Sequence, residues 1–185
     1  MSIDNTRLIA AIDRNFAEIN NAILKLKAYN SLCASNFSHA GMSFFFIAHQ
    51  ALFNDMIANA IRVLDKHKDA ASLWYIIKCN EAVSKKIANQ LDINVENILL
   101  LSQKLRHIRE KTHFHIDKDS VVQPKSVWKT ADISGSEFVK LLDDVANYLA
   151  YIKKEMFGGE LLVVTKYDAL DVKQIVSAYE KWRDC

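Results

Sequence analysis

Residues 134–159 read SGSEFVKLLDDVANYLAYIKKEMFGG and decide the fold class. Ser134 and Glu137 have the spacing of a capping box, in which a serine hydroxyl and a glutamate carboxylate satisfy free backbone amides at the start of a helix. The stretch therefore predicts a long amphipathic helix that ends at the glycine pair 158–159. Its apolar face consists of Phe138, Leu141, Leu142, Val145, Tyr148, Leu149, Ile152 and Met156.

Apolar residues at helical spacing also indicate helices in most of the rest of the chain. We expect helices at 3–30, 42–64, 72–79, 81–90, from 95 to about 115, and from about 169 onward, with a loop at 118–133. Because 42–64 is apolar on nearly all sides and includes the phenylalanine run 44–46, we expect it to be the most buried helix. The pattern predicts an all-α fold, a four-helix bundle with short additional helices, as a single domain of residues 1–185.

The composition excludes several other classes. Of 185 residues, 4 are glycine and 1 is proline, against average usages of about 7% and 5%, which argues against a sheet-rich fold. Gly158-Gly159 is the only glycine pair, so nucleotide binding through a Rossmann or Walker-type loop is excluded. The formal net charge is only +2, and any basic binding site must therefore be local.

The cysteines and the hydropathy indicate the compartment. Cys33, Cys79 and Cys185 are odd in number and never have C-x-x-C spacing, which favours neither a disulfide framework nor a zinc site. A Cys/His nucleophile would need a histidine beside one of them, and nothing in the spacing requires it. No run of 18 apolar residues occurs, and we expect neither a signal peptide nor a membrane-spanning helix. We expect a cytoplasmic protein with no membrane contact, no metal and no cofactor.

One basic segment has the residue types that phosphate chemistry needs. Residues 104–118 read KLRHIREKTHFHIDK and contain three of the six histidines. Five Lys and Arg against two acidic residues give this segment a local charge of +3. Arginine binds phosphate oxygens through forked donors, and histidine exchanges protons near neutral pH. The segment therefore suits cleavage of a phosphodiester.

Helical geometry separates the candidate residues of this segment. At about 100 degrees per residue, Arg109 and His115 flank the buried face of the predicted helix on either side. Arg106 and His113 fall on the solvent side, where they can contact a ligand. Arg109 and His115 are about 120 degrees apart on an ideal helix, so their convergence needs a distorted helix end or a second copy of the chain.

Two segments resemble a known family. The run from Arg109 to His115 fits the R-x4-6-H pattern of the HEPN superfamily, as R-x5-H. More narrowly, residues 108–119 (IREKTHFHIDKD) are similar to the abortive-infection U-type branch. Residues 62–65 (RVLD), followed by Ser-Leu-Trp at 72–74, are similar to a second segment of that branch.

The resemblance implies a helical bundle that dimerises so that two R-x5-H motifs face each other. It also implies a metal-independent endoribonuclease of phage-defence or toxin-antitoxin systems, with RNA as substrate and a cognate antitoxin or defence-system protein as a further partner. In that family role, Arg109 binds the scissile phosphate, and two copies of His115 divide the acid and base steps at the ribose 2'-hydroxyl. The product then ends in a cyclic phosphate.

The neighbouring residues have supporting roles in this interpretation. Glu110 orients Arg109, and Arg106, Lys111 and His113 contact the RNA. The family's switched-off toxins have a modified tyrosine two residues after the histidine, but Asp117 stands there, which argues against control by that modification.

Other interpretations remain open for several of these residues. The main alternative function is a non-catalytic helical bundle that uses the basic segment to bind nucleic acid, nucleotide or a protein partner. A third possibility is a purely structural dimer in a larger complex. Arg62 and Asp65 suit an ion pair within one helix better than a site wall, and His49 suits the core better than a ligand position. The phenylalanine run 44–46 is expected in the core.

Overall fold

The computed structural model describes residues 5–34, 43–108, 110 and 129–183. Every regular element in these ranges is a helix, which confirms the predicted all-α fold. The predicted continuation into 109–115 lies, apart from residue 110, outside the described residues, and the other helices begin and end close to their predicted bounds. In chain order the helices are α1 (Asn5–Cys33), α2 (Ser43–Val63), α3 (Leu73–Cys79), α4 (Glu81–Gln90), α5 (Val95–Ile108), α7 (Gly135–Phe157) and α8 (Leu170–Arg183).

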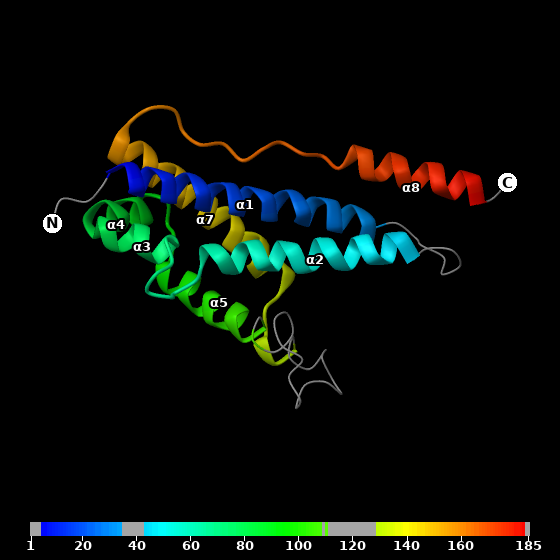
Figure 1. Cartoon of the computed structure of the whole chain (residues 1–185), viewed down its shortest axis with the longest axis horizontal. Helices are drawn as coiled ribbons and strands as arrows, with labels where there is room; N and C mark the ends of the chain where they lie inside the picture. Colours follow the sequence, from blue (N-terminus) through cyan, green and yellow to red (C-terminus); the bar gives the residue numbers. More distant parts are fainter. Residues whose placement is uncertain (1–4, 35–42, 109, 111–128, 184–185) are drawn as a thin grey trace.

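Helices α1, α2 and α7 form the centre of the molecule (Figure 1). α1 and α2 run antiparallel side by side, and α7 packs against α1. Their apolar stripes meet in a core where full burial contributes about 1.5–3 kcal/mol for each large aliphatic side chain. Fully buried members include Leu8, Ile12 and Ile19 of α1, Ile57 of α2, and Leu142 and Leu149 of α7.

The start of α7 confirms the predicted capping box. The Glu137 backbone amide donates to the Ser134 hydroxyl at 3.2 Å. The Ser134 amide in turn donates to the Glu137 carboxylate at 2.8 Å. At the other end, Gly158 follows α7 with a φ of +72°, a backbone conformation that glycine adopts without steric cost. Residues 134–159 therefore contain both the start and the stop signal of α7.

Replacing Ser134 with alanine is expected to lower the free energy of unfolding by about 1 kcal/mol, because the first turn of α7 loses its cap. Hydrogen bonds from the Ser134 hydroxyl and amide also lower the pKa of Glu137 below its ordinary value of 4.5. That stabilisation is present above pH 4.5 and is lost as the pH falls through the lowered pKa. Urea titrations at neutral and acidic pH measure both effects, with exposed Ser177→Ala as the control. An unchanged unfolding midpoint for Ser134→Ala would show that the cap contributes nothing.

The short helices α3 and α4 close one end of the bundle. Asn80 caps α4 by accepting the Val83 amide at 3.2 Å. The buried Tyr148 hydroxyl of α7 donates to the Ser84 carbonyl of α4 at 2.9 Å. These contacts attach α4 to α7 and place α5, which follows directly, beside the end of α2.

After α7 the chain runs in extended form along α1 before α8 begins (Figure 1). Asn20 of α1 holds this segment at Thr165 through two hydrogen bonds. Its Nδ2 donates to the Thr165 hydroxyl at 3.0 Å, and the Thr165 amide donates to its Oδ1 at 2.7 Å. α8 then covers the end of α1 and the start of α2, where a second, smaller apolar cluster forms around Leu32, Phe45 and Val176.

The prediction that residues 42–64 form the most buried helix is wrong for the first half of α2. Phe45 is buried, but the side chains of Phe44, Phe46 and Ile47 are 72%, 67% and 63% exposed. The first turns of α2 extend beyond α7, and among the described helices they are covered by α1 and α8 (Figure 1). Because successive helical residues point about 100 degrees apart, one covered face buries only one residue of the run 44–46.

Candidate functional site

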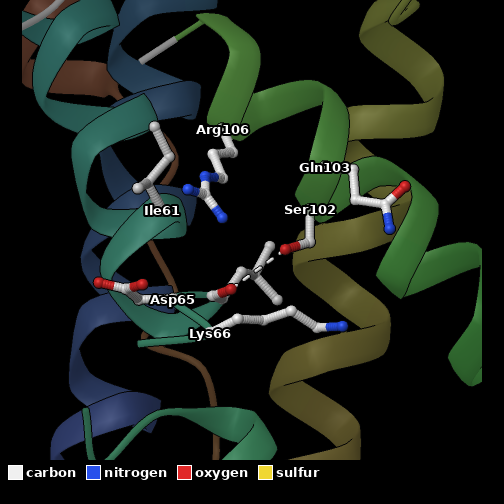
Figure 2. A pocket seen from close by; sticks show the side chains of 7 residues that line it. Ile61, Asp65, Lys66, Ser102, Gln103 and Arg106 are labelled. Atoms are coloured by element: carbon white, nitrogen blue, oxygen red, sulfur yellow. Dashed lines mark hydrogen bonds between the residues drawn. The ribbon is translucent and has the colours of Figure 1, made fainter. Parts of the chain in front are cut away.

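A small polar pocket lies between the end of α2 and α5 (Figure 2). Its volume is about 130 Å³. That is ample room for a group the size of one phosphate, and the pocket is open to solvent. Arg106 extends from α5 toward α2 across it (Figure 2). The lining residues are Ile61, Leu64, Asp65, Lys66, Ser102, Gln103 and Arg106.

The backbone carbonyl of Leu64 connects the helices around the pocket through two hydrogen bonds. The carbonyl of Leu64, just after the last residue of α2, accepts the Ser102 hydroxyl of α5 at 3.1 Å. It also accepts the indole N–H of Trp74 in α3 at 2.9 Å. Carbonyls at a helix end have no partner within their own helix, and these two donors satisfy one of them. The end of α2 is thereby attached to both α3 and α5.

The positive charge of Arg106 at the pocket is partly balanced by the carboxylate of Glu110. The Arg106 Nε donates to the Glu110 carboxylate at 2.7 Å, and the Arg106 side chain remains 64% exposed. The hydrogen bond and charge of Glu110, with a smaller contribution from the charge of Asp65, raise the pKa of Arg106 above its usual value. Lys66 places its ammonium group 5.0 Å from the Trp74 ring centroid, a cation–π contact. Asp65 accepts the His67 amide at 3.0 Å.

The structure describes two of the six predicted site residues. Arg106 lies on the solvent side of α5, as its helical position predicts, and Glu110 is its ion-pair partner one turn later. The candidate catalytic residues Arg109 and His115, and the candidate RNA contacts Lys111 and His113, lie outside the described residues. The described part of α5 extends to Ile108, which is fully buried. The R-x5-H run therefore begins one residue after a position held in the core.

The segment 62–65 divides between two environments. Arg62 does not form its ion pair within α2 but with Glu18 of α1, at 3.2 Å. Glu18 is buried and also pairs with Arg14, at 2.7 Å. Asn59 donates to the Glu18 carbonyl at 3.3 Å. Arg62 thus belongs to a polar contact between α1 and α2. Asp65 instead lines the pocket, although the spacing in the sequence favoured an ion pair between Arg62 and Asp65 over a place in a site wall.

Sequence reasoning missed the contributions of Ser102, Gln103 and Lys66 to this pocket. The position of Ser102 could have indicated its role, because it lies between Ile98 and Leu105 on the buried stripe of α5, where a hydroxyl needs a hydrogen-bond partner. Nothing in the sequence indicates the roles of Gln103 and Lys66, since exposed polar residues are common at helix ends. Only the contact between α2 and α5 brings them together.

Two larger hollows flank the start of α7. One, of about 450 Å³, lies between α5 and α7 and contains Lys104, Glu137, Lys140 and Asp144. The other, of about 410 Å³, is mainly apolar and lies between α1, α2 and α7. Neither contains a histidine or cysteine among its lining residues. They therefore lack the histidine that the basic segment supplies.

Comparisons with protein-family models, with curated proteins and with solved structures give no match. Among the described residues, no group of three His, Cys, Asp or Glu side chains is placed to bind a metal ion. No described helix is both long and apolar enough to cross a membrane.

Proposed function

We propose that the protein is a metal-independent endoribonuclease of the HEPN type that acts in phage defence or as a toxin. One observation supports this proposal most directly. Segment 62–65 and the helix that leads into 108–119 are distant in the sequence, yet Asp65 and Arg106 line the same pocket. One segment of the family resemblance therefore lies beside the helix that leads into the other.

The pocket and the basic run fit the recognition of an RNA backbone. Arg106 and Lys66 place two cationic groups beside a space of phosphate size. In the proposed reaction, Arg109 binds the scissile phosphate and His115 removes the proton from the ribose 2'-hydroxyl. The hydroxyl oxygen attacks the adjacent phosphorus, the bond to the 5'-oxygen of the next nucleotide breaks, and a second His115 protonates that oxygen. Lys111 and His113 hold neighbouring phosphates.

The proposed active unit is a homodimer. Arg109 and His115 are about 120 degrees apart on an ideal helix, so one helix does not bring both to the same phosphate, and a second copy supplies the missing partner. The cleavage rate per protein molecule should then fall on dilution below the dimer dissociation constant. A rate per molecule that stays constant while the protein becomes monomeric would exclude the dimeric site.

The deciding experiment is cleavage of transfer RNA and total RNA by the purified full chain in EDTA. We expect fragments that end in a 2',3'-cyclic phosphate, identified because a phosphatase makes the ends ligatable only after mild acid has opened the cyclic phosphate. Cleavage that needs a divalent metal, or that leaves 3'-hydroxyl ends, would contradict the proposal. RNA that is bound with steep salt dependence but stays intact would favour the alternative, a non-catalytic bundle that binds nucleic acid.

Replacing Arg106 with alanine is expected to weaken RNA binding and to reduce the slope of log K against log salt by about 1, because one phosphate contact is lost. Binding is measured in the His115→Ala background, so that the RNA is not cut. Lys85→Ala removes an equal charge from the exposed face of α4 and should leave the slope unchanged. Equal slopes for Arg106→Ala and Lys85→Ala would place the RNA elsewhere.

A further inference from the structure

A second group of reactive side chains lies where α1 ends and α2 begins, outside the candidate RNA site. The Sγ of Cys33, the last residue of α1, is 3.1 Å from the Nε2 of His49 in α2. The two residues are 16 positions apart in sequence, and the antiparallel packing of α1 on α2 brings them together. A histidine at this distance is placed to take the proton of a thiol.

Two further side chains hold this pair. Tyr29, one turn before Cys33, stacks its ring on the His49 imidazole with centroids 4.3 Å apart. Burial, followed by a hydrogen bond to Cys33 and the charge of Cys33, raises the pKa of Tyr29. The Gln50 amide nitrogen lies 3.4 Å from the Nδ1 of His49. When this amide is rotated by half a turn about its terminal bond, its oxygen accepts from Nδ1–H and Nε2 accepts a proton.

The two described cysteines differ in their surroundings. Cys33 is exposed to solvent, so a small reagent can reach its sulfur. Cys79 is half-buried and packs against the main core at the end of α3. Accessible thiols beside a proton acceptor are the ones that react selectively.

We propose that Cys33 is a nucleophilic modification site for small organic disulfides, with His49 as its base. The Cys33 sulfur attacks one sulfur of the disulfide while its proton passes to Nε2 of His49. A mixed disulfide forms on Cys33 and the original sulfur–sulfur bond breaks. The leaving thiolate takes the proton from the imidazolium and departs as a thiol, so one protein thiol is oxidised and half of the reagent is reduced.

This site is independent of the proposed nuclease site. His49 lies in the first half of α2 and the polar pocket lies at the end of this helix. At about 1.5 Å per residue, the two are about 20 Å apart along the helix axis. Loss of reactivity at Cys33 and loss of RNA cleavage are therefore separate outcomes, and neither implies the other.

The test uses the native full chain with glutathione disulfide, and peptide mass spectrometry reports the rate at each cysteine. We expect native Cys33 to react about 10-fold or more faster than Cys79, and faster than Cys33 itself in the urea-unfolded chain, where His49 is no longer adjacent. Equal rates for Cys33 in the native and unfolded chains would overturn the proposal, whatever any variant does.

His49→Ala should lower the native rate at Cys33 about 10-fold or more, and free imidazole should restore part of it by occupying the space left by the ring. His67→Ala, which removes an exposed histidine, is the matched control and should leave the rate unchanged. A His49→Ala protein that reacts as fast as wild type would exclude His49 as the base. So would a slow variant that imidazole does not rescue.

Discussion

His115→Ala is expected to lower the rate of RNA cleavage in EDTA by about 100-fold or more. The physical reason is that a positioned general base or acid contributes about 100- to 10,000-fold to such a proton transfer. In the proposed dimer both copies of His115 act, one as base and one as acid, so the single substitution removes both roles at once. Initial rates on a labelled RNA measure the effect, with the ends of the fragments analysed in parallel.

Arg109→Ala should cause a loss of similar order, because Arg109 stabilises the negative charge that develops on the phosphate. Arg109→Lys should recover little, since an ammonium group cannot reproduce the forked contact of a guanidinium with phosphate oxygens. His107→Ala is the matched control, because His107 is an exposed histidine of α5. Full activity in folded His115→Ala or Arg109→Ala protein would remove the R-x5-H run from the mechanism.

Ile108→Ala is expected to have the largest effect on stability among single changes near the site. Ile108 is fully buried and is the last residue in the described part of α5. Truncation of a buried isoleucine to alanine removes its apolar contacts and leaves a cavity, and together these effects cost about 2–5 kcal/mol. A urea titration followed by circular dichroism measures the free energy of unfolding. The exposed neighbour change His107→Ala should stay within about 0.5 kcal/mol of wild type.

The same variant tests how the buried end of α5 supports the proposed site. Ile108 directly precedes Arg109, so its packing determines where the R-x5-H run begins. We expect the cleavage rate of Ile108→Ala, corrected for the folded fraction, to fall as well. An unfolding free energy equal to that of His107→Ala would show that α5 does not end in the core.

The helices themselves could be predicted from local sequence. The capping box at Ser134 and the glycine pair after α7 are signals within a few residues of the structure that they specify. The apolar stripes of α1, α5 and α7 likewise identify the buried faces, because a helix with 3.6 residues per turn displays its own pattern. For this reason the bounds of α4 and the solvent position of Arg106 agree with the sequence.

The candidate site could be predicted only in part. A charged run at 104–118 is visible in the sequence, and so is the family resemblance of 62–65. Which of these residues share a pocket is a property of the contact between α2 and α5. A local pattern specifies which face of a helix is apolar, but not which helix covers it or where that cover ends.

The sequence by itself therefore determined the all-α class, the approximate bounds of most helices and the composition of the basic run, although residues 129–131, predicted as loop, are helical. Only the tertiary structure decided that Phe44 and Phe46 are exposed, that Arg62 pairs with Glu18, and that Cys33 meets His49. The physical reason is the separation in sequence between the residues that interact. Helix capping and periodicity depend on residues at most a few turns apart, whereas burial, ion pairing and thiol reactivity depend on side chains that only the packing of separate helices brings within a few ångströms.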